Sequence, residues 1–254
     1  MICMKMHQVI FGDLFERGIM EKLEGRNGYK VLNHGFVALV ESMGSDLSVV
    51  RNARVSYDAE WRAGEDEGKD SKLIHYLVKN GHTSPFESVQ FTFDVKAPIF
   101  VFRQHHRHRT WSYNEISARY SKLPCEMFLP SIETITTQHS SNKQMRTEDQ
   151  NENAQQIREV MKSQNESAYK TYERLIELGT PRELARTVLP VAIYSHMFAT
   201  VDLLNLMKFI KLRDHEHAQY EIRVYAQAML ELIRPIVPVC VTAFEKYWLN
   251  KEPI

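Results

Sequence analysis

The sequence predicts a single-domain α+β protein, and three observations support this class. Apolar residues recur at helical spacing in several segments, most clearly over residues 201–212 and 218–233. Over residues 89–95 they alternate with polar residues, as in a half-buried strand. The length of 254 residues suits one substantial core, and the sequence has no internal repeat. We therefore expect one domain in which long helices flank a central, mostly antiparallel sheet.

The first expected element is an amphipathic helical extension over residues 1–28, which ends at a break rich in glycine. The remaining residues, 29–254, are expected to form the domain. In chain order its first half should contain a strand over 29–40, a helix over 46–55 capped by Ser45 or Asp46, a helix over 71–79, a short helix from the capping box at Ser84, a strand over 89–95 and a helix opened by Pro98.

The second half opens with a polar segment. Residues 131–162 are rich in Gln, Asn, Ser, Thr and charge, which predicts a mobile insertion that leads into a helix. That helix should stop at Gly179, and the capping-box pattern at 180–183 should open the next one. The helices over 201–212 and 218–233 complete the expected order.

The charge balance restricts the ligands of this chain. Lys plus Arg and Asp plus Glu both number 32, so no global field attracts nucleic acid or an anionic membrane, and any anion must be bound locally. The three cysteines are far apart and form no CxxC pair, which argues against a disulfide framework or a structural zinc. Charged residues interrupt the apolar N-terminal segment, so we expect neither a signal peptide nor a membrane span. The composition predicts a cytoplasmic protein.

A cationic segment between Arg103 and Tyr120 contains four arginines and three histidines within eighteen residues. On the helix opened by Pro98, Arg103 and Arg107 would lie four residues apart on one face, and forked guanidinium groups suit phosphates. A solvated cationic face is the alternative, although such faces usually mix in Glu and Lys. The segment therefore predicts a binding site for an anionic ligand.

Two spacings also allow a metal site. His105 with His108, and His217 with Glu221, are three and four residues apart, as ligands of one metal ion can be. The arginines around the first pair oppose a cation, and the sequence contains no HExxH pattern. We expect no metal, and His108 can instead hydrogen-bond a cofactor carbonyl or ring nitrogen.

Ser112 and Glu115 have the spacing of a capping box, which predicts a helix that carries Ser117 and Arg119. The free amides at the start of such a helix would add to the arginines in binding an anion. Capping and ligand binding can coexist in these residues.

The cationic segment contains the pattern RHR-x2-S-x-N-E-x-S-x-R-Y, whose nine specified residues all fall within residues 107–120. This pattern resembles the signature of the flavin-dependent thymidylate synthases. Four further segments resemble parts of that family in the same order, so that the resemblance covers most of the chain outside the N-terminal extension and the polar insertion. They are DLSVVRNARVS at 46–56, NGHTSPFE at 80–87, RELARTVLP at 182–190 and LRDHEHAQYEIR at 212–223.

The resemblance implies that the chain methylates dUMP to dTMP, with methylenetetrahydrofolate as carbon donor and a hydride that passes from NADPH through FAD. It also implies a homotetramer with shared active sites, and a folate placed against the flavin near His82. The residues implied to contact dUMP are Gln104, Arg107, Glu115, Ser117, Arg119, Arg186 and Arg213. The residues implied to contact FAD are Ser56, His82, Ser84, Arg107, His108, Arg109, Glu115, Asp202 and His217.

Arg213 is the residue that the resemblance implies for activation of the substrate. C5 of uracil is a poor nucleophile, and no cysteine lies in the motif to activate it by addition to the ring. Cys125 is the nearest thiol, and we expect it to be buried and structural. A guanidinium on a pyrimidine carbonyl would stabilise the developing negative charge instead. A salt bridge with Asp214 or Glu216 is the alternative role for Arg213.

Two further residues are candidates for the chemistry. Ser117 is a candidate nucleophile by position, but a hydroxyl needs a base and its neighbours are mostly arginines, so we assign it to phosphate or ring binding. By the resemblance, Glu115 would lie between nucleotide and flavin.

The sequence departs from the family pattern in the segment implied to hold FAD. Asp202 and Leu204 stand where Asn and Arg are common, and an ionised carboxylate cannot donate as an amide does. Lys208, where Asn is expected, can compensate. Ser84 replaces a common Thr and keeps the hydroxyl.

Two other functions remain open from the sequence. A metal-dependent nucleotide hydrolase would be inactivated by a chelator. A non-catalytic scaffold would retain its properties after substitution of Arg213. A nucleic-acid-binding module is disfavoured, because it predicts a basic surplus that this chain lacks.

Overall fold

The computed structural model describes residues 21–250, and all structural statements concern this part of the chain. Six strands form one sheet in the order β1-β2-β3-β4-β8-β5, and every neighbouring pair is antiparallel. The expected α+β class with a central antiparallel sheet is therefore confirmed. The strands are β1 (Glu21–Lys22), β2 (Gly28–Val31), β3 (Gly35–Met43), β4 (Gln90–Pro98), β5 (Ser112–Glu115) and β8 (Tyr194–Asp202).

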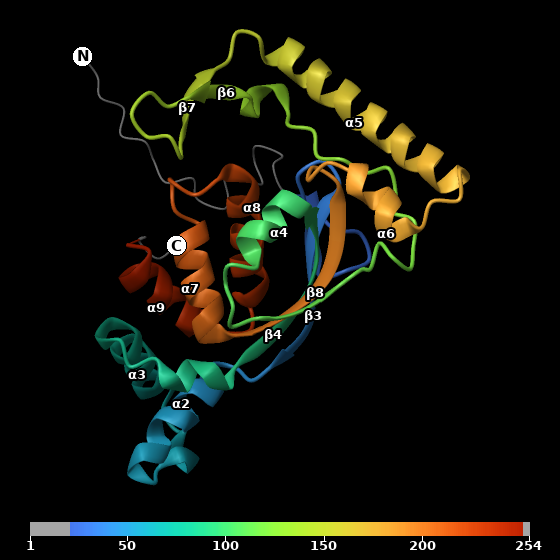
Figure 1. The fold of residues 1–254 in the computed structure, drawn as a ribbon. Coiled ribbons are helices and arrows are strands. Elements are labelled where there is room, and N and C mark those ends of the chain that lie inside the picture. The colour runs from blue at the N-terminus through green and yellow to red at the C-terminus, as the bar shows by residue number, and fades with distance from the viewer. Residues whose placement is uncertain (1–20, 251–254) are drawn as a thin grey trace, which may run out of the picture.

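Strand β4 confirms the alternation that predicted it. Phe91, Phe93 and Val95 are fully buried on one face, where they join the main core. β3 pairs along one edge of β4 and β8 along the whole of the other. These three long strands cross the middle of the molecule in Figure 1.

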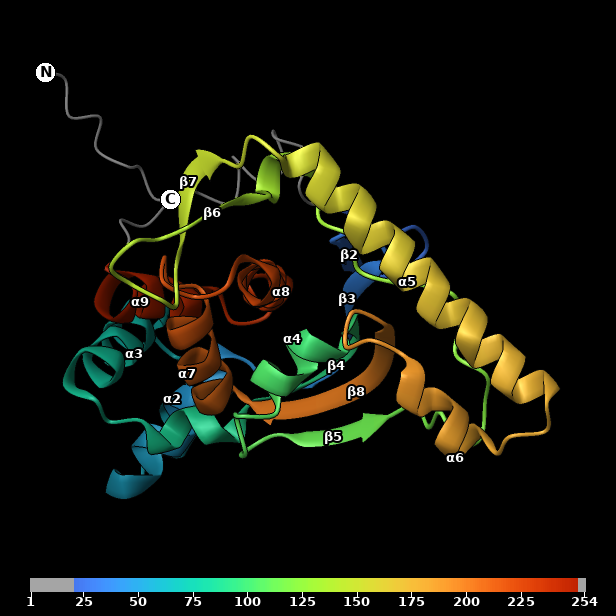
Figure 2. The same cartoon turned by 45° about the horizontal axis from the view of Figure 1, so that its top comes forward.

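Helices α7 (Leu203–Arg213), α8 (Tyr220–Ile233) and α9 (Pro238–Trp248) follow the last strand of the sheet. Helix α8 is buried along most of its length and packs against β2 and β3. Figure 2 shows α7 and α8 on the same side of the sheet as the short helix α4 (Ile99–His105). The first two of these C-terminal helices confirm the expectation, whereas α9 was not predicted. The amides of Val239 and Cys240 at the start of α9 donate to the Asp46 carboxylate at 2.9 and 3.0 Å, which is a contact between distant parts of the sequence.

Helices α2 (Asp46–Arg54) and α3 (Glu67–Asn80) confirm the helices expected over 46–55 and 71–79. Asp66 caps the start of α3 by accepting a hydrogen bond from the Lys69 amide at 3.0 Å. Both helices lie at one end of the molecule in Figures 1 and 2, and α6 (Arg182–Ala185) lies at the opposite end. The ligand contacts expected near α2 and α6 therefore lie far apart within one chain.

The long helix α5 (Ala154–Glu177) precedes α6 and forms a second, smaller core with it. Tyr172 of α5 is fully buried there together with Ile193. The helix stops where expected, because Gly179 adopts a left-handed conformation (φ +80°) that favours glycine.

The polar insertion contains structure that its composition did not predict. Strands β6 (Thr136–Gln138) and β7 (Arg146–Gln150) form a separate two-stranded antiparallel sheet. The hydroxyl groups of Thr137 and Thr147 are hydrogen-bonded across it at 2.6 Å. β-branched threonines suit strands although they are polar, which explains why composition alone predicted an irregular segment. This two-stranded unit is called the insertion hairpin below.

The prediction that a helix begins at Ser112 is wrong. Ser112–Glu115 form β5, whose residues pair with Met197 to Thr200 of β8. The local capping signal is overridden by the ladder of backbone hydrogen bonds with β8, a strand that the sequence did not predict. Ser117 and Arg119 therefore lie in the turn that follows a strand, and the amides of a helix N-terminus are not available there.

Near the N-terminus two further expectations differ from the structure. The single strand expected over 29–40 is the hairpin of β2 and β3, and residues 21–22 form β1 where a helix was expected. Residues 1–20, which hold the rest of the expected helical extension, lie outside the described residues. Within residues 21–250 no helix combines the length and the apolar character that crossing a bilayer requires.

Candidate active site

Helix α4 carries the first part of the cationic segment. Its apolar residues Val101 and Phe102 are buried, which fixes the helix on the sheet, and Arg103 is exposed on its outer side. The helix ends at His105, so Arg107 and Arg109 lie in the turn beyond it and not on the helical face that their spacing predicted. Both are exposed, and their side chains form no hydrogen bond or ion pair with another residue in the described part of the chain. Their guanidinium groups can therefore meet an anion from outside the chain.

His105 is a structural residue at the end of α4. Its ring is fully buried against Trp111 and Phe209, with Nδ1 3.2 Å from the Tyr113 hydroxyl. Because Tyr113 donates its proton to a backbone carbonyl, Nδ1 carries the donor and Nε2 is left buried without a hydrogen-bond partner in the described chain. Burial lowers the pKa of His105 to about 3, with a smaller contribution from neighbouring cationic groups.

Arg213, at the end of α7, contacts the end of α4. Its Nε donates to Nε2 of His108 at 3.1 Å, and its Nη2 donates to the backbone carbonyl of Gln104 at 3.1 Å. Burial and the charge of Arg213 lower the pKa of His108 to about 4, so the ring is neutral and can accept this bond. Arg213, Gln104 and His108 with the neighbouring Arg107 are called the first group below.

Four other residues expected at the nucleotide site lie together elsewhere. Glu115 of β5 accepts a hydrogen bond from Ser195 Oγ at 2.5 Å. Arg119 forms an ion pair with Glu183 at 3.3 Å, and both side chains are more than half exposed. Glu115 and Arg186 line a pocket of about 280 Å³ together with Ser195. The second group below means Glu115, Ser117, Arg119 and Arg186.

The two groups lie at opposite ends of α4. Ile99, the first residue of this helix, lines the pocket of the second group, whereas Gln104 at its other end contacts Arg213 of the first group. The rise of about 1.5 Å per residue separates these ends by roughly 7 Å along the axis. None of the first group lines the pocket of the second. The expected dUMP residues therefore form two groups within the described chain.

Ser117 has no base beside it. Its Oγ accepts a hydrogen bond from the Arg119 amide at 3.3 Å, within the turn after β5. Among the described residues, no carboxylate or imidazole forms a hydrogen bond with this hydroxyl. The geometry thus supports a binding role for Ser117 over a nucleophilic one.

The residues expected at FAD are mostly exposed donors. Ser56 lies in the turn after α2, His82 and Ser84 follow α3, and all three are exposed. Arg109 and His217 are also exposed and lie near the first group and the start of α8. Hydroxyl, imidazole and guanidinium donors suit a pyrophosphate and the polar edge of a flavin, so this set fits FAD chemically.

The departures from the family pattern have structural roles in this chain. Asp202 caps α7, where one of its oxygens accepts from the Asn205 amide at 2.9 Å and the other from the Asn205 side chain at 2.5 Å. Leu204 is buried in the main core, while Lys208 is exposed. Both oxygens of Asp202 are therefore already engaged.

Side chains from both candidate metal pairs contact other residues. His105 is bound by Tyr113 and His108 by Arg213, while Glu221 forms an ion pair with Arg146. Over residues 21–250, no group of three or more His, Cys, Asp or Glu side chains is placed to hold a metal ion.

Cys125 is exposed, which corrects the expectation of a buried thiol: it lies in an irregular segment between two turns and not in a core element.

Three residues that contact the expected site residues directly or through a neighbour could not be inferred from the sequence. Ser195 contacts Glu115 only because β8 pairs with β5, and β8 gave no clear alternation. Gln219 contacts Gln104 directly, while Arg146 contacts Glu221, which in turn accepts a hydrogen bond from Gln219. In the sequence, Arg146 differs from its surroundings only as a basic residue beside threonine in the polar insertion.

A single α+β domain with exposed arginines at a helix end and around a pocket defines a class of proteins that bind anionic ligands. The model of the family described as thymidylate synthase complementing protein matches residues 38–239. A flavin-dependent thymidylate synthase of Ehrlichia ruminantium (strain Gardel) is 41% identical over 254 residues, which cover 99% of this chain and 84% of the relative. One of Thermotoga neapolitana is 46% identical over 217 residues, covering 85% and 94%.

The fold also has a close match among solved structures. A UMP/dUMP methylase, PolB from Streptomyces cacaoi bound with 5-Br dUMP, superposes with a TM-score of 0.79 at 36% identity, covering 86% of this chain and 98% of the other. The chain therefore belongs to the flavin-dependent thymidylate synthase family of methyltransferases, as the motif at residues 107–120 indicated.

Proposed function

We propose that this enzyme methylates dUMP to dTMP, with methylenetetrahydrofolate as the carbon donor and NADPH as the source of the hydride. The names of its relatives support the reaction, and the 5-bromo nucleotide bound by the Streptomyces cacaoi neighbour supports a uridine nucleotide as substrate. The observation that carries the proposal is the position of Arg213, which two hydrogen bonds hold against the end of α4.

Arg213 is proposed to activate the pyrimidine. A guanidinium has five N–H donors, and the bonds to His108 and Gln104 use two of them. The remaining donors can hydrogen-bond a uracil carbonyl and stabilise the enolate-like form of the ring, in which negative charge on that oxygen makes C5 nucleophilic toward the methylene carbon. Because neutral His108 accepts from Nε, the guanidinium is oriented before the substrate binds. A fixed donor of this kind stabilises the transition state without reorganisation during the reaction.

The second group is proposed to hold the nucleotide. Arg119 and Arg186 are suited to the phosphate, because planar guanidinium forks match its oxygens. Ser117 would add a hydroxyl donor to the phosphate or the ring. Glu115, kept in place by Ser195, would face the side of the nucleotide where the flavin lies. From the first group, Gln104 and Arg107 would complete the contacts with dUMP.

FAD is proposed to be held by Ser56, His82, Ser84, His108, Arg109 and His217, with Arg107 and Glu115 beside it. When bound, FAD supplies the hydride that completes the methyl group after NADPH has reduced it. Asp202, whose oxygens are engaged by Asn205, would act on this site by fixing the start of α7.

We also propose that several copies of the chain, in a homotetramer, build each active site. Within one chain the dUMP contacts form two separate groups, and the FAD contacts lie near both α2 and α8. A second copy that placed its second group against the first group of its neighbour would complete one nucleotide site. The symmetry of such an assembly would then repeat this site in every subunit.

The absorption spectrum of the purified protein tests the proposal. After incubation with excess FAD and desalting, we expect a retained flavin spectrum that shifts when dUMP is added, and dTMP formation when folate and NADPH are supplied. A chelator should leave this activity unchanged, since a metal-dependent hydrolase alone would lose it. A colourless protein that forms no dTMP would overturn the proposed reaction.

A further inference from the structure

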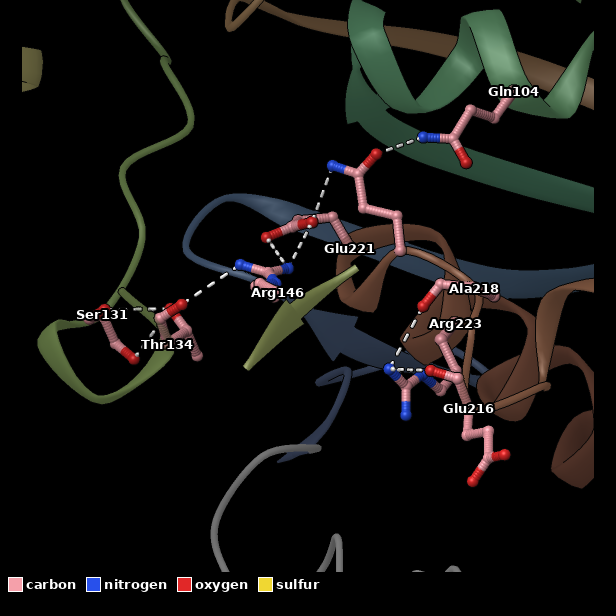
Figure 3. A network of polar contacts seen from close by, with 9 residues as sticks. Gln104, Ser131, Thr134, Arg146, Glu216, Ala218, Glu221 and Arg223 are labelled. Carbon is pink, nitrogen blue, oxygen red and sulfur yellow. Dashed lines mark hydrogen bonds and ion pairs between the residues drawn. The ribbon is translucent and has the colours of Figure 1, made fainter. Parts of the chain in front are cut away.

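A continuous set of polar contacts joins the insertion hairpin to the end of α4 (Figure 3). At its outer end, Arg146 of β7 donates from Nη2 to both oxygens of Glu221, at 2.8 and 2.9 Å. The Nη1 atom of Arg146 donates to the carbonyl of Thr134 in the same insertion at 3.1 Å, and its guanidinium lies 5.8 Å from the Tyr220 ring centroid. Arg146 is thus fixed to its own segment and to α8 together.

Glu221 is a buried carboxylate that requires these partners. Its side chain is 4% exposed, whereas that of Arg146 is 36% exposed. A carboxylate withdrawn from water is stable only when charges and hydrogen bonds replace its hydration. Arg146 supplies the charge, and Gln219 Nε2 donates a further hydrogen bond to Glu221 at 2.8 Å. The orientation of Gln219 therefore depends on a carboxylate that Arg146 holds.

The same contacts reach the first group. The side-chain carbonyl of Gln219 accepts a hydrogen bond from the side chain of Gln104. The backbone carbonyl of Gln104 in turn accepts from Arg213, the residue proposed to activate the pyrimidine. Four side chains thus connect the insertion hairpin with the residues proposed to contact the uracil.

A second contact fixes the loop between α7 and α8 to the same hairpin. Nδ1 of His217 lies 2.8 Å from the sulfur of Met145, the residue before Arg146. Hairpin and loop together enclose a pocket of about 260 Å³, which is lined by Met145, Arg146 and His217. The insertion therefore contacts the loop between Arg213 and Gln219 through Met145, and the start of α8 through the neighbouring Arg146.

We propose that Arg146 is a positioning residue of this enzyme, which acts through Glu221 and Gln219 to fix Gln104 and the loop after Arg213. This inference rests on the proposed function, because it assigns the insertion a part in orienting the dUMP site. It makes the insertion hairpin a component of the active site although none of its residues needs to touch the substrate. Local order at the end of α4 should then depend on the ion pair between Arg146 and Glu221.

The test compares two variants with a matched control. Arg146→Met removes the charge and keeps the length, but it leaves Glu221 buried and unpaired, which is itself destabilising. The double variant Arg146→Met with Glu221→Gln removes both charges, and its amide can still accept from Gln219. The control is Arg158→Met: Arg158 also anchors the insertion, through the Pro130 carbonyl at 3.0 Å, but has no contact with this set of residues.

The first measurement is hydrogen exchange of peptides that cover residues 104–108 and 214–219 in the holoenzyme. The amides of His106 and His108 are hydrogen-bonded at the end of α4, so loss of order there is visible as faster exchange. We expect faster exchange in both segments for the Arg146→Met and double variants and not for Arg158→Met. Unchanged exchange in a folded double variant would overturn the proposal.

The second measurement is kcat and KM for dUMP in the same proteins. We expect kcat/KM to fall between about 2- and 30-fold in the double variant, the range typical of residues that act through others, with flavin retained and the thermal midpoint close to that of the wild type. Kinetics equal to those of Arg158→Met would overturn the positioning role. The two proposals can fail separately. If the wild type forms no dTMP but the Arg146 variants still exchange faster than Arg158→Met, the proposed reaction is refuted and the structural link is supported.

Discussion

The guanidinium of Arg213 donates from Nε to Nε2 of His108 at 3.1 Å, and this bond joins the end of α7 to the turn after α4. Burial and the neighbouring Arg213 keep His108 neutral, which leaves its ring nitrogen free to accept. The pair is unusual in that two potentially cationic side chains face each other. Its stability depends on one of them staying unprotonated, so the orientation of Arg213 depends on the neutral form of His108.

Arg213→Ala should abolish dTMP formation and leave the fold intact. Removal of a single donor that stabilises developing charge typically lowers kcat by about 10² to 10³. The loss should appear in the dTMP assay with flavin content and thermal midpoint unchanged. Lys211→Ala is the matched control, since this exposed cation lies on the same helix and contacts Trp248. Full activity of Arg213→Ala would refute activation by this residue.

Arg119→Ala should weaken the binding of dUMP. A hydrogen bond to a charged group contributes about 1.5 to 3 kcal/mol, which corresponds to a roughly 10- to 150-fold rise in the dissociation constant. Titration of the holoenzyme with dUMP, followed by the flavin spectrum, measures this change. Lys122→Ala is the control, because Lys122 forms a similarly exposed ion pair with Glu173 at 2.7 Å. Equal affinities of the two variants would mean that Arg119 does not contact the nucleotide.

The buried histidines should make the protein less stable in mild acid. The pKa of His105 is about 3 in the fold, below the ordinary value of 6.5, so the unfolded chain binds more protons between these two values. Above pH 6.5 the titration of His105 therefore does not lower the free energy of unfolding, and below pH 6.5 that free energy falls as the pH decreases toward 3. His108, with a pKa of about 4, acts in the same direction. The thermal midpoint of the wild type should decrease from pH 7 to pH 5.

His105→Gln tests this origin of the pH dependence. The glutamine side chain can still hydrogen-bond Tyr113 but cannot take up a proton, so the slope of the thermal midpoint against pH should be smaller than in the wild type. Scanning calorimetry at several pH values measures the slope. An identical slope in the two proteins would show that His105 does not contribute.

The sequence allowed prediction of elements whose residues report directly on burial. The alternation at Phe91, Phe93 and Val95 located β4, and Gly179 located the end of α5. β8 escaped prediction although its burial alternates along the strand, with Met197, Ala199 and Val201 buried on one face. The polar Ser195 is buried on that face and the apolar Phe198 is exposed on the other, so the alternation of apolar and polar residues is interrupted. β5 escaped because its pairing with β8 outweighs the local capping signal.

In the candidate site, too, local sequence patterns predicted some residues, whereas contacts between distant parts of the chain were not predicted. The motif made Arg107, Arg119 and their neighbours candidates, because a pattern of nine specified residues in one short segment can be recognised without knowledge of the fold. The contact between Arg213 and His108 joins residues 105 positions apart, and that between Arg146 and Glu221 joins residues 75 apart. Such pairs depend on how α4, α7 and the insertion hairpin pack, which local patterns do not encode.

The division of the nucleotide contacts into two groups predicts that inactive variants restore each other. Arg213→Ala lacks the activating arginine of the first group, and Arg186→Ala lacks a phosphate-binding arginine of the second. At a dUMP concentration near the KM of the wild type, each variant alone should therefore have little activity. If each site combines the two groups from different subunits, then in a randomly mixed assembly about a quarter of the sites should contain both intact groups. Mixing the variants after mild dissociation and reassembly should therefore restore up to about a quarter of the wild-type dTMP formation. The same variants mixed without dissociation serve as the control. A mixture that stays inactive after proven subunit exchange would show that one chain supplies both groups to its own site, and the shared-site proposal would then fail.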